Sequence, residues 1–474
     1  MSRTTLSARE RIEHLLDGAS FVEIGGQITS RSTDFNVNPQ ETPGDGVITG
    51  YGVIDGNLVY VYSQDASVLG GSIGEMNARK IGNIYDLAMK VGAPVIGLID
   101  CAGLRLQEAV DALGSFGALF TKQTMASGVI PQLTGIFGTC GGGSALIPTL
   151  TDFTVMEKEK GRLFVNSPNA LLGNKISKLD TAEAVYQGTN NSQVDIVADG
   201  EEEVISRLRE LIMILPACFD DDASYEECTD DLNRIIPELG DLGQDARSIF
   251  SKISDNNFFL ELKKEYAKDM ITGFARLNGV TVGCVGNQST DSDSVLSTRG
   301  ANKAAEFVNI CDAFQIPVLT IVNTTGFKAT VHEELTIAKA TAKLTYSFAN
   351  ATIPKVTLMT GDAFGTAYIA MNSKSIGADI VYAWPNARVG MMEPEQAVRI
   401  MYADEINHTE DKLDLIAEKT AAYEELQSSV MSAARRGYVD DIIEPDATRK
   451  RLIAAFEMLF TKREDRPAKR HGTV

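Results

Sequence analysis

The sequence predicts an α/β protein built from two copies of one domain. Ile48–Gly56 reads ITGYGVIDG and Ile271–Gly279 reads ITGFARLNG, which places the two segments 223 positions apart. Carried forward without a gap, the same offset pairs Lys80 with Lys303, Pro94 with Pro317, Gly103 with Gly326, Pro131 with Pro354 and Gly142 with Gly365. One register held over about ninety residues indicates an internal duplication. We therefore expect two domains, at residues 1–235 and 236–474.

Each copy has the same predicted order of elements. A strand, a tight Asp55-Gly56 turn and a second strand come first, in VITGYGVIDGNLVYVYSQ at 47–64. A helix follows at 77–91, where apolar side chains recur at helical spacing. The apolar runs PVIGLID (94–100) and PVLTIVN (317–323) are typical of strands covered on both faces. A further helix, a third strand and a glycine-bearing loop that opens another helix complete a layered α/β unit.

Composition excludes several classes of function. A net charge of −20 over 474 residues argues against nucleic acid or an anionic membrane as the main partner. The six cysteines form no CxxC pair, which predicts no zinc site and reduced thiols in a cytoplasmic protein. The N-terminus has no apolar signal region, and no apolar run reaches the ~18 residues of a membrane span. The acidic stretch near 180–245 is interpreted as a solvated linker between the copies.

Four loops that follow the buried strands are the candidate sites of catalysis. They are CAGLR (101–105) and TCGGGSAL (139–146) in the first copy, and TTGFK (324–328) and AFGTAYIA (363–370) in the second. Glycine between a strand and a helix lets main-chain N–H groups point at a ligand oxygen. Two converging donors form an oxyanion hole. The alternative is that these loops are only tight turns between a strand and a helix. From the residues alone we infer no more than a duplicated α/β enzyme with two anion-stabilising loops.

Longer segments carry a family resemblance. Three segments resemble the carboxyltransferase (beta) subunits of biotin-dependent acyl-CoA carboxylases, such as propionyl-CoA carboxylase. They are GDGVITGYGVIDGNLVYVYSQDASVLGGSIGEMNARKI (44–81), YAWPNARV (382–389) and RGYVDDIIEPDATRKRL (436–452). They also resemble transcarboxylase and the alpha subunit of the sodium-pumping methylmalonyl-CoA decarboxylase. The resemblance implies two tandem crotonase-like (ClpP/crotonase) domains that move CO₂ between carboxybiotin and the α-carbon of an acyl-CoA. It also implies a site shared between two subunits, and hence a homo-oligomer between a dimer and a hexamer.

The resemblance implies a role for each loop. Both reacting partners become enolates, so the chemistry needs two oxyanion holes. Gly142 and Gly143, helped by Ala102 and Gly103, are expected to face the thioester oxygen. Gly365, Thr366 and Ala367, helped by Thr325 and Gly326, are expected to face the biotin oxygen, and the opposite assignment stays open. Further candidates are Arg105, Arg79 and Lys80 for the coenzyme A phosphates, Tyr368 against biotin, and Ile369 at the acyl pocket.

Biotin is expected on a separate carrier. Ala88–Val91 (AMKV) imitates a biotinylation motif, but it falls in the amphipathic helix predicted at 77–91. The implied partners are therefore a biotin carboxyl carrier protein and a biotin carboxylase or a membrane decarboxylase subunit. The favoured substrates are propionyl-CoA and methylmalonyl-CoA.

Several motifs depart from the family pattern. The usual Ser-Gly-Gly-Ala-Arg is CAGLR, the usual Tyr-Gly-Gly-Ala-Tyr-Asp is FGTAYI (364–369), and the segment after NSPNALLG (166–173) is shorter. These departures keep open a non-catalytic scaffolding paralogue. The carboxyltransferase subunit of a sodium-pumping acyl-CoA decarboxylase also stays open, because this chain does not encode the partner subunits that set the direction of CO₂ flow. A crotonase-type hydratase would need glutamates in the glycine loops, and none is there.

Overall fold

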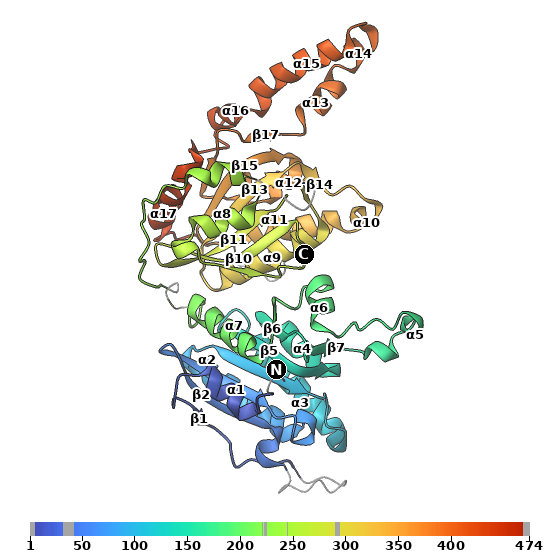
Figure 1. The fold of residues 1–474 in the computed structure, drawn as a ribbon, viewed down its shortest axis with the longest axis vertical. Helices are drawn as coiled ribbons and strands as arrows, with labels where there is room; N and C mark the ends of the chain where they lie inside the picture. Colours follow the sequence, from blue (N-terminus) through green and yellow to red (C-terminus); the bar gives the residue numbers. More distant parts are fainter. Residues whose placement is uncertain are drawn as a thin grey trace. The chain divides into compact units, whose positions relative to one another are not determined.

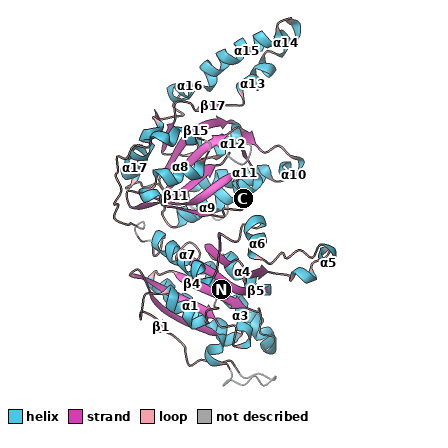
Figure 2. Cartoon of the chain, in the orientation of Figure 1, coloured by secondary structure: helices cyan, strands magenta, loops and turns pink. Residues whose placement is uncertain are grey.

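A computed structural model describes residues 5–31, 42–219, 221, 225–243, 245–289 and 294–467. The chain divides into two compact units, Met1–Ser224 and Tyr225–Val474. Figure 1 shows both units and Figure 2 their helices and strands. Each unit has its own sheet and its own buried core.

The sheet of the first unit has the strand order β1-β2-β3-β4-β5-β6-β8, with β7 paired to β5. β2 and β3 form the predicted antiparallel hairpin, and the pairs from β3 onward are parallel. The hairpin turns at Asp55 and Gly56, both at positive φ (47° and 83°), as a tight two-residue turn requires. The strands are β1 (Val22–Glu23), β2 (Val47–Ile54), β3 (Asn57–Gln64), β4 (Val95–Cys101), β5 (Gln132–Gly141), β6 (Phe153–Glu157), β7 (Arg162–Phe164) and β8 (Ile196–Ala198).

Helices cover both faces of this sheet. α2 packs with α3 on one face, while α1 packs with α7 on the other. Apolar side chains of α2 and α3, such as Ile81, Ile84 and Phe116, join the buried strand residues in one core. The helices are α1 (Ala8–Leu15), α2 (Glu75–Val91), α3 (Ala109–Ala126), α4 (Leu146–Leu150), α5 (Asn174–Ser177), α6 (Ala184–Asn190) and α7 (Glu201–Ile214).

The second unit repeats this topology. Its sheet runs β9-β10-β11-β13-β15-β16-β18, with β17 paired to β15. The bounds of β10, β11, β13 and β15 equal those of β2, β3, β4 and β5 shifted by 223 positions. The strands are β9 (Phe259–Leu262), β10 (Met270–Leu277), β11 (Val280–Asn287), β12 (Val295–Leu296), β13 (Val318–Thr324), β14 (Gly326–Phe327), β15 (Lys355–Phe364), β16 (Ile380–Ala383), β17 (Arg388–Gly390) and β18 (Asp441–Ile442).

The helices of the second unit follow the same plan. α9 packs with α11, and α8 packs against β10 and β11. The helices are α8 (Ala246–Ile253), α9 (Thr298–Ala313), α10 (Val331–Glu334), α11 (Ile337–Asn350), α12 (Gly365–Ala370), α13 (Pro394–Met401), α14 (Ala403–His408), α15 (Lys412–Tyr423), α16 (Val430–Arg435) and α17 (Thr448–Leu459).

Single contacts are also duplicated. The buried Lys80 donates from Nζ to the Val47 carbonyl, and the buried Lys303 donates to the Met270 carbonyl, 223 positions later in both partners. Asp100 Oδ1 accepts a hydrogen bond from the Thr139 N–H at 3.3 Å. Its counterpart Asn323 Oδ1 accepts from the Asp362 N–H at 3.0 Å, with the same offset. The predicted duplication is therefore confirmed down to individual hydrogen bonds.

The prediction of a solvated linker at 180–245 is wrong for most of the first half of that segment. Residues 184–214 form α6, β8 and α7 of the first unit. Helix α7 is amphipathic: Val204, Leu208 and Leu211 form a buried apolar stripe, and acidic residues such as Glu202 and Glu203 lie between them in the sequence. The high acidic content concealed this amphipathic pattern.

The remaining expectations from composition concern thiols, metals and membranes. All six cysteines are free, and four of them are buried. Within the described residues, no cluster of His, Cys, Asp and Glu could hold a metal ion. Over the same part of the chain, no helix is both long and apolar enough to cross a membrane.

Candidate active site

The fold brings the candidate loops together in pairs. In the first unit β4 and β5 are parallel neighbours, with Cys101 opposite Cys140, so the loops that follow them leave the same edge of the sheet. In the second unit β13 and β15 are parallel neighbours, with Thr324 opposite Ala363. Ligands of open α/β sheets bind at the carboxyl ends of the strands. Each unit therefore has one candidate site at an equivalent place.

The first set of donors lies at Gly142 and Gly143. β5 ends at Gly141, and a 3₁₀ turn over Gly142–Ala145 leads into α4. The first N–H groups of a helix have no acceptor within it, and Gly141 supplies no capping side chain. Gly142 has a φ of +64°, which favours glycine. Ser144 Oγ donates to the Gly141 carbonyl at 2.7 Å, which fixes the turn behind the donors.

The second set of donors repeats this arrangement. β15 ends at Phe364, and α12 begins at Gly365 with Thr366 and Ala367 as its next residues. Gly365 has a φ of +63°, almost the value at Gly142, and Phe364 provides no side-chain cap. The first turn of α12 therefore presents uncapped N–H groups. Thr366 is exposed, and although it replaces the usual glycine it keeps a main-chain N–H that can donate.

The expected helper residues have their N–H groups engaged elsewhere. The Ala102 N–H donates to the Gly70 carbonyl at 2.9 Å, and the Gly103 N–H donates to Cys101 Sγ at 3.3 Å. In the second unit the Thr325 N–H donates to the Ser294 carbonyl at 2.6 Å, and the Gly326 N–H donates to Thr324 Oγ1 at 3.4 Å. We therefore remove these four N–H groups from the proposed donors and keep the loops as walls of the sites.

Arg105 and Lys80 hold the fold together instead of facing solvent. The Arg105 side chain is 1% exposed and pairs with Asp45 and, at 2.8 Å, with Glu108. Its remaining donors reach Ser72 and the Asp45 carbonyl. A phosphate would have to break this buried network, which is costly because it leaves buried charges unpaired. We withdraw Arg105 as a coenzyme A ligand.

Lys80 is withdrawn for the same physical reason. It is 3% exposed, and its ammonium donates to the carbonyls of Gly44 and Val47. Burial lowers its pKa from 10.5 to about 8. Arg79, the preceding residue, is exposed on α2 and stays in the candidate set.

Tyr368 and Ile369 lie in α12, directly after the second donor set. The Tyr368 side chain is buried, and burial raises its pKa to about 12, so the phenol stays protonated at neutral pH. Ile369 is half-buried. A packed tyrosine and a half-buried aliphatic side chain give this end of the second unit an apolar character.

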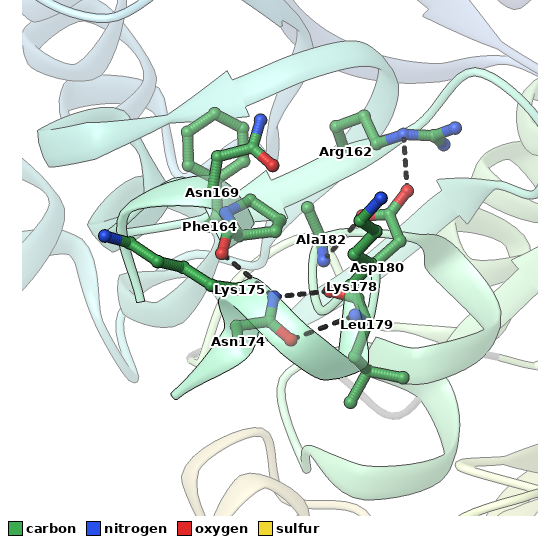
Figure 3. A pocket seen from close by; sticks show the side chains of 10 residues that line it. Arg162, Phe164, Asn169, Asn174, Lys175, Lys178, Leu179, Asp180 and Ala182 are labelled. Atoms are coloured by element: carbon green, nitrogen blue, oxygen red, sulfur yellow. Dashed lines mark hydrogen bonds and ion pairs between the residues drawn. The ribbon is translucent and has the colours of Figure 1, made fainter. Parts of the chain in front are cut away.

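The sequence prediction missed a cavity with a cationic lining next to β7, the strand that pairs with the end of β5. β7 pairs with β5 so that Phe164 lies opposite Gly141, and a cavity of about 670 Å³ adjoins it. Figure 3 shows this cavity. Its arginine, Arg162, corresponds by strand pairing to Arg388, an offset of 226 positions instead of 223. The gapless register used for the duplication therefore could not reveal the pair.

The duplicated parallel topology and the two loops at equivalent strand ends define a protein with two tandem crotonase-like domains. The profile of the carboxyl transferase domain matches residues 1–474. The chain belongs to the carboxyl transferase domain family. The resemblance seen in the sequence is thereby confirmed.

Individual relatives span almost the whole chain. The alpha subunit of methylmalonyl-CoA decarboxylase from Propionigenium modestum is 40% identical, over 99% of this chain and 93% of that protein. The propionyl-CoA carboxylase beta chain of Roseobacter denitrificans is 40% identical, over 100% and 94%. A crystal structure of hexameric transcarboxylase 12S with hydrolysed methylmalonyl-coenzyme A bound superposes with a TM-score of 0.92. It is 36% identical and covers 99% of this chain and 92% of that one.

Proposed function

We propose that this chain is a carboxyltransferase subunit that moves CO₂ between carboxybiotin on a separate carrier and the α-carbon of a short-chain acyl-CoA. Propionyl-CoA and methylmalonyl-CoA are the favoured pair. One observation carries the proposal: each unit presents an uncapped set of N–H donors after a glycine at φ near +64°, at equivalent places in a duplicated fold. A reaction with two enolates needs two such sets.

The first set acts on the thioester. Removing the CO₂ group or the α-proton of an acyl-CoA places negative charge on the thioester oxygen. The N–H groups of Gly142 and Gly143 stabilise this charge, and a donor of this kind is worth about 3–4 kcal/mol of transition-state stabilisation. The donors are main-chain groups fixed at the end of a strand, so they need little rearrangement during the reaction.

The second set suits the ureido group of biotin. When bound, carboxybiotin supplies the CO₂, and its ureido nitrogen serves as the base for the α-proton. The start of α12 fits the ureido oxygen because it presents the N–H groups of Gly365, Thr366 and Ala367. The neighbouring Tyr368 is proposed to pack against the uncharged ring system of biotin, and the half-buried Ile369 to line the acyl pocket. This chain then needs no catalytic histidine or carboxylate.

The proposal includes partners and assembly. The chain would work in the cytoplasm with a biotin carboxyl carrier protein and a biotin carboxylase, as a homo-oligomer between a dimer and a hexamer. The hexamer of transcarboxylase 12S supports the upper limit. Light scattering of the purified protein measures the oligomeric state, and an active monomer would contradict the proposed assembly.

A second candidate differs only in the direction of CO₂ flow. The decarboxylase alpha subunit of Propionigenium modestum and the carboxylase beta chain of Roseobacter denitrificans are both 40% identical to this chain. The protein would then pass CO₂ from methylmalonyl-CoA to the carrier and onward to a membrane decarboxylase subunit.

The test is transfer of labelled CO₂. The purified chain is mixed with a biotinylated carrier and methylmalonyl-CoA labelled in its free carboxyl group, and label on the carrier is measured. Transfer that needs both the chain and the biotin supports the proposal. An oligomer that binds the carrier without transferring label would instead be a scaffolding paralogue.

A further inference from the structure

Lys328 of the second unit occupies the place that Arg105 occupies in the first. The two residues are 223 positions apart, which is the offset of the duplication. Their main-chain contacts agree with this pairing. The Arg105 N–H donates to the Ile73 carbonyl at 2.9 Å, and the Lys328 N–H donates at 3.0 Å to the carbonyl of Leu296, 223 positions after Ile73. The two side chains therefore start from equivalent points of the fold and differ in what surrounds them.

The carboxylates that bury Arg105 are not repeated at the same offset. Asp45 and Glu108 hold the guanidinium of Arg105, whose side chain is 1% exposed. The residues 223 positions later are Lys268 and Val331. Neither of these side chains can accept a hydrogen bond from a cation. The second unit thus lacks the two acceptors that make the cation of the first unit a structural residue.

A third carboxylate, Glu333, takes over only part of the role of Glu108. Its Oε2 accepts from the Thr298 N–H at 2.7 Å and so holds the start of α9, as Glu108 holds the start of α2. Glu108 also pairs with Arg105 at 2.8 Å. Among the described residues, no ion pair joins Glu333 to Lys328. The helix contact has been kept in the second unit, and the clamp on the cation has been lost.

Lys328 adjoins the second donor set. It comes directly after β14, and β14 packs against α12 (Figure 1). The first turn of α12 presents the N–H groups of Gly365, Thr366 and Ala367. Lys328 is exposed, in contrast to its buried counterpart. The second donor set therefore has an accessible ammonium next to its neutral donors, which suits a ligand with a negative charge close to a carbonyl oxygen.

We propose that Lys328 binds the carboxylate of carboxybiotin while Gly365, Thr366 and Ala367 bind the ureido oxygen. Carboxybiotin has a negative charge on the group beside its ureido carbonyl, whereas the ring system of biotin without CO₂ is uncharged. A cation at this place favours the carboxylated form. The proposal rests on the proposed function and adds a residue that distinguishes the two states of the carrier. Lys328 positions the carboxylate and itself forms or breaks no covalent bond.

The binding test uses biotinamide and a derivative with a carboxymethyl group on the ureido nitrogen. The derivative keeps a carboxylate beside the ureido carbonyl but cannot transfer it. Calorimetry measures both dissociation constants for the oligomeric wild type and for K328Q, K328R and K450Q. Lys450 is an exposed lysine of α17 in the same unit, so its loss tests for a general effect of charge.

K328Q should weaken binding of the carboxymethyl derivative roughly tenfold, which is the size of one hydrogen bond to a charged group. Its affinity for biotinamide should not change. K328R should keep most of the preference for the derivative because the positive charge remains. K450Q should bind both compounds as the wild type does.

A kinetic arm follows the carrier itself. In K328Q the KM for the carboxylated carrier, with propionyl-CoA as acceptor, should rise about tenfold. The KM for the uncarboxylated carrier, with methylmalonyl-CoA as donor, should not change. The kcat/KM should fall by the same factor in both directions, because a variant cannot alter the overall equilibrium.

The outcomes separate this proposal from the proposed function. Selective binding of the derivative that depends on Lys328, without any carboxyl transfer, would keep the site and refute the proposed function. Equal losses for both biotinamides, unchanged affinities in K328Q, or no binding of the derivative to the wild type would overturn the site. A loss confined to methylmalonyl-CoA relative to propionyl-CoA would place Lys328 at the acyl-CoA and would also overturn the proposal.

Discussion

Replacing Gly142 with valine should abolish most turnover while leaving the fold intact. Gly142 has a φ of +64°, and a Cβ added there would meet no atom within 4 Å. The Cβ itself therefore creates no clash, and the expected cost is backbone strain of about 1–2 kcal/mol for a side chain in the left-handed region. The donor loop can relieve that strain only by turning, which moves the N–H groups of Gly142 and Gly143. Losing one oxyanion donor costs about 10²–10³-fold in turnover.

Gly56→Val is the matched control for this experiment. Gly56 also has positive φ (83°), its added Cβ also meets nothing within 4 Å, and it lies in the β2–β3 turn away from the donors. Both variants should lose similar stability in chemical denaturation, and both should keep the wild-type circular dichroism. Only Gly142→Val should lose turnover in the labelled-CO₂ assay. Turnover of Gly142→Val within about threefold of Gly56→Val, far less than a lost donor costs, would refute the assignment.

Four further outcomes are expected. Lys303→Met should cost roughly 1–3 kcal/mol for each main-chain carbonyl left unpaired, since Nζ in its ammonium form donates to three of them. Burial lowers the Lys303 pKa from 10.5 to about 7, so the unfolded chain holds a proton that the folded one has lost. The free energy of unfolding of the wild type should therefore rise between pH 7 and 10.5, and the variant should lack this rise in denaturant titrations. Lys90 should carry no biotin by mass spectrometry after co-expression with a biotin ligase, because it lies within the regular helix α2; a biotinylated Lys90 would overturn that interpretation. We propose that the apolar Ile369 lines the acyl pocket, so kcat/KM values for acetyl-, propionyl- and butyryl-CoA should lie within about 10³-fold of one another; a larger spread would contradict a relaxed pocket.

Much of the fold could be predicted because it depends on local patterns. The hairpin at 47–64 and the buried strand starting near Pro94 come from β-branched residues, turn residues and continuous apolar runs. The donor loops were predicted because glycines follow a buried strand at matching positions in both copies, and the structure gives Gly142 and Gly365 positive φ. These features need no knowledge of which distant side chains meet.

The site residues that we withdrew are those whose roles depend on contacts with distant parts of the chain. Nothing local distinguishes the exposed Arg79 from the buried Lys80, whose carbonyl partners lie more than thirty residues away. Arg105 follows a glycine loop and has the charge for a phosphate, but Asp45 reaches it from a distant part of the chain. Such pairings are specified by the three-dimensional packing of the unit, which composition and spacing do not contain.

The duplication explains how one fold could acquire two different sites. The main-chain donors are retained in both units because they depend on backbone geometry, which Gly142 and Gly365 share. Side chains around them are free to diverge without disturbing that geometry. Thr139 in one unit and Asp362 in the other give one such difference, since Asp362 clamps Arg388 and Thr139 offers no carboxylate to the equivalent Arg162. Divergence of this kind would adapt the two donor sets to different ligands, while the oxyanion chemistry stays the same in both.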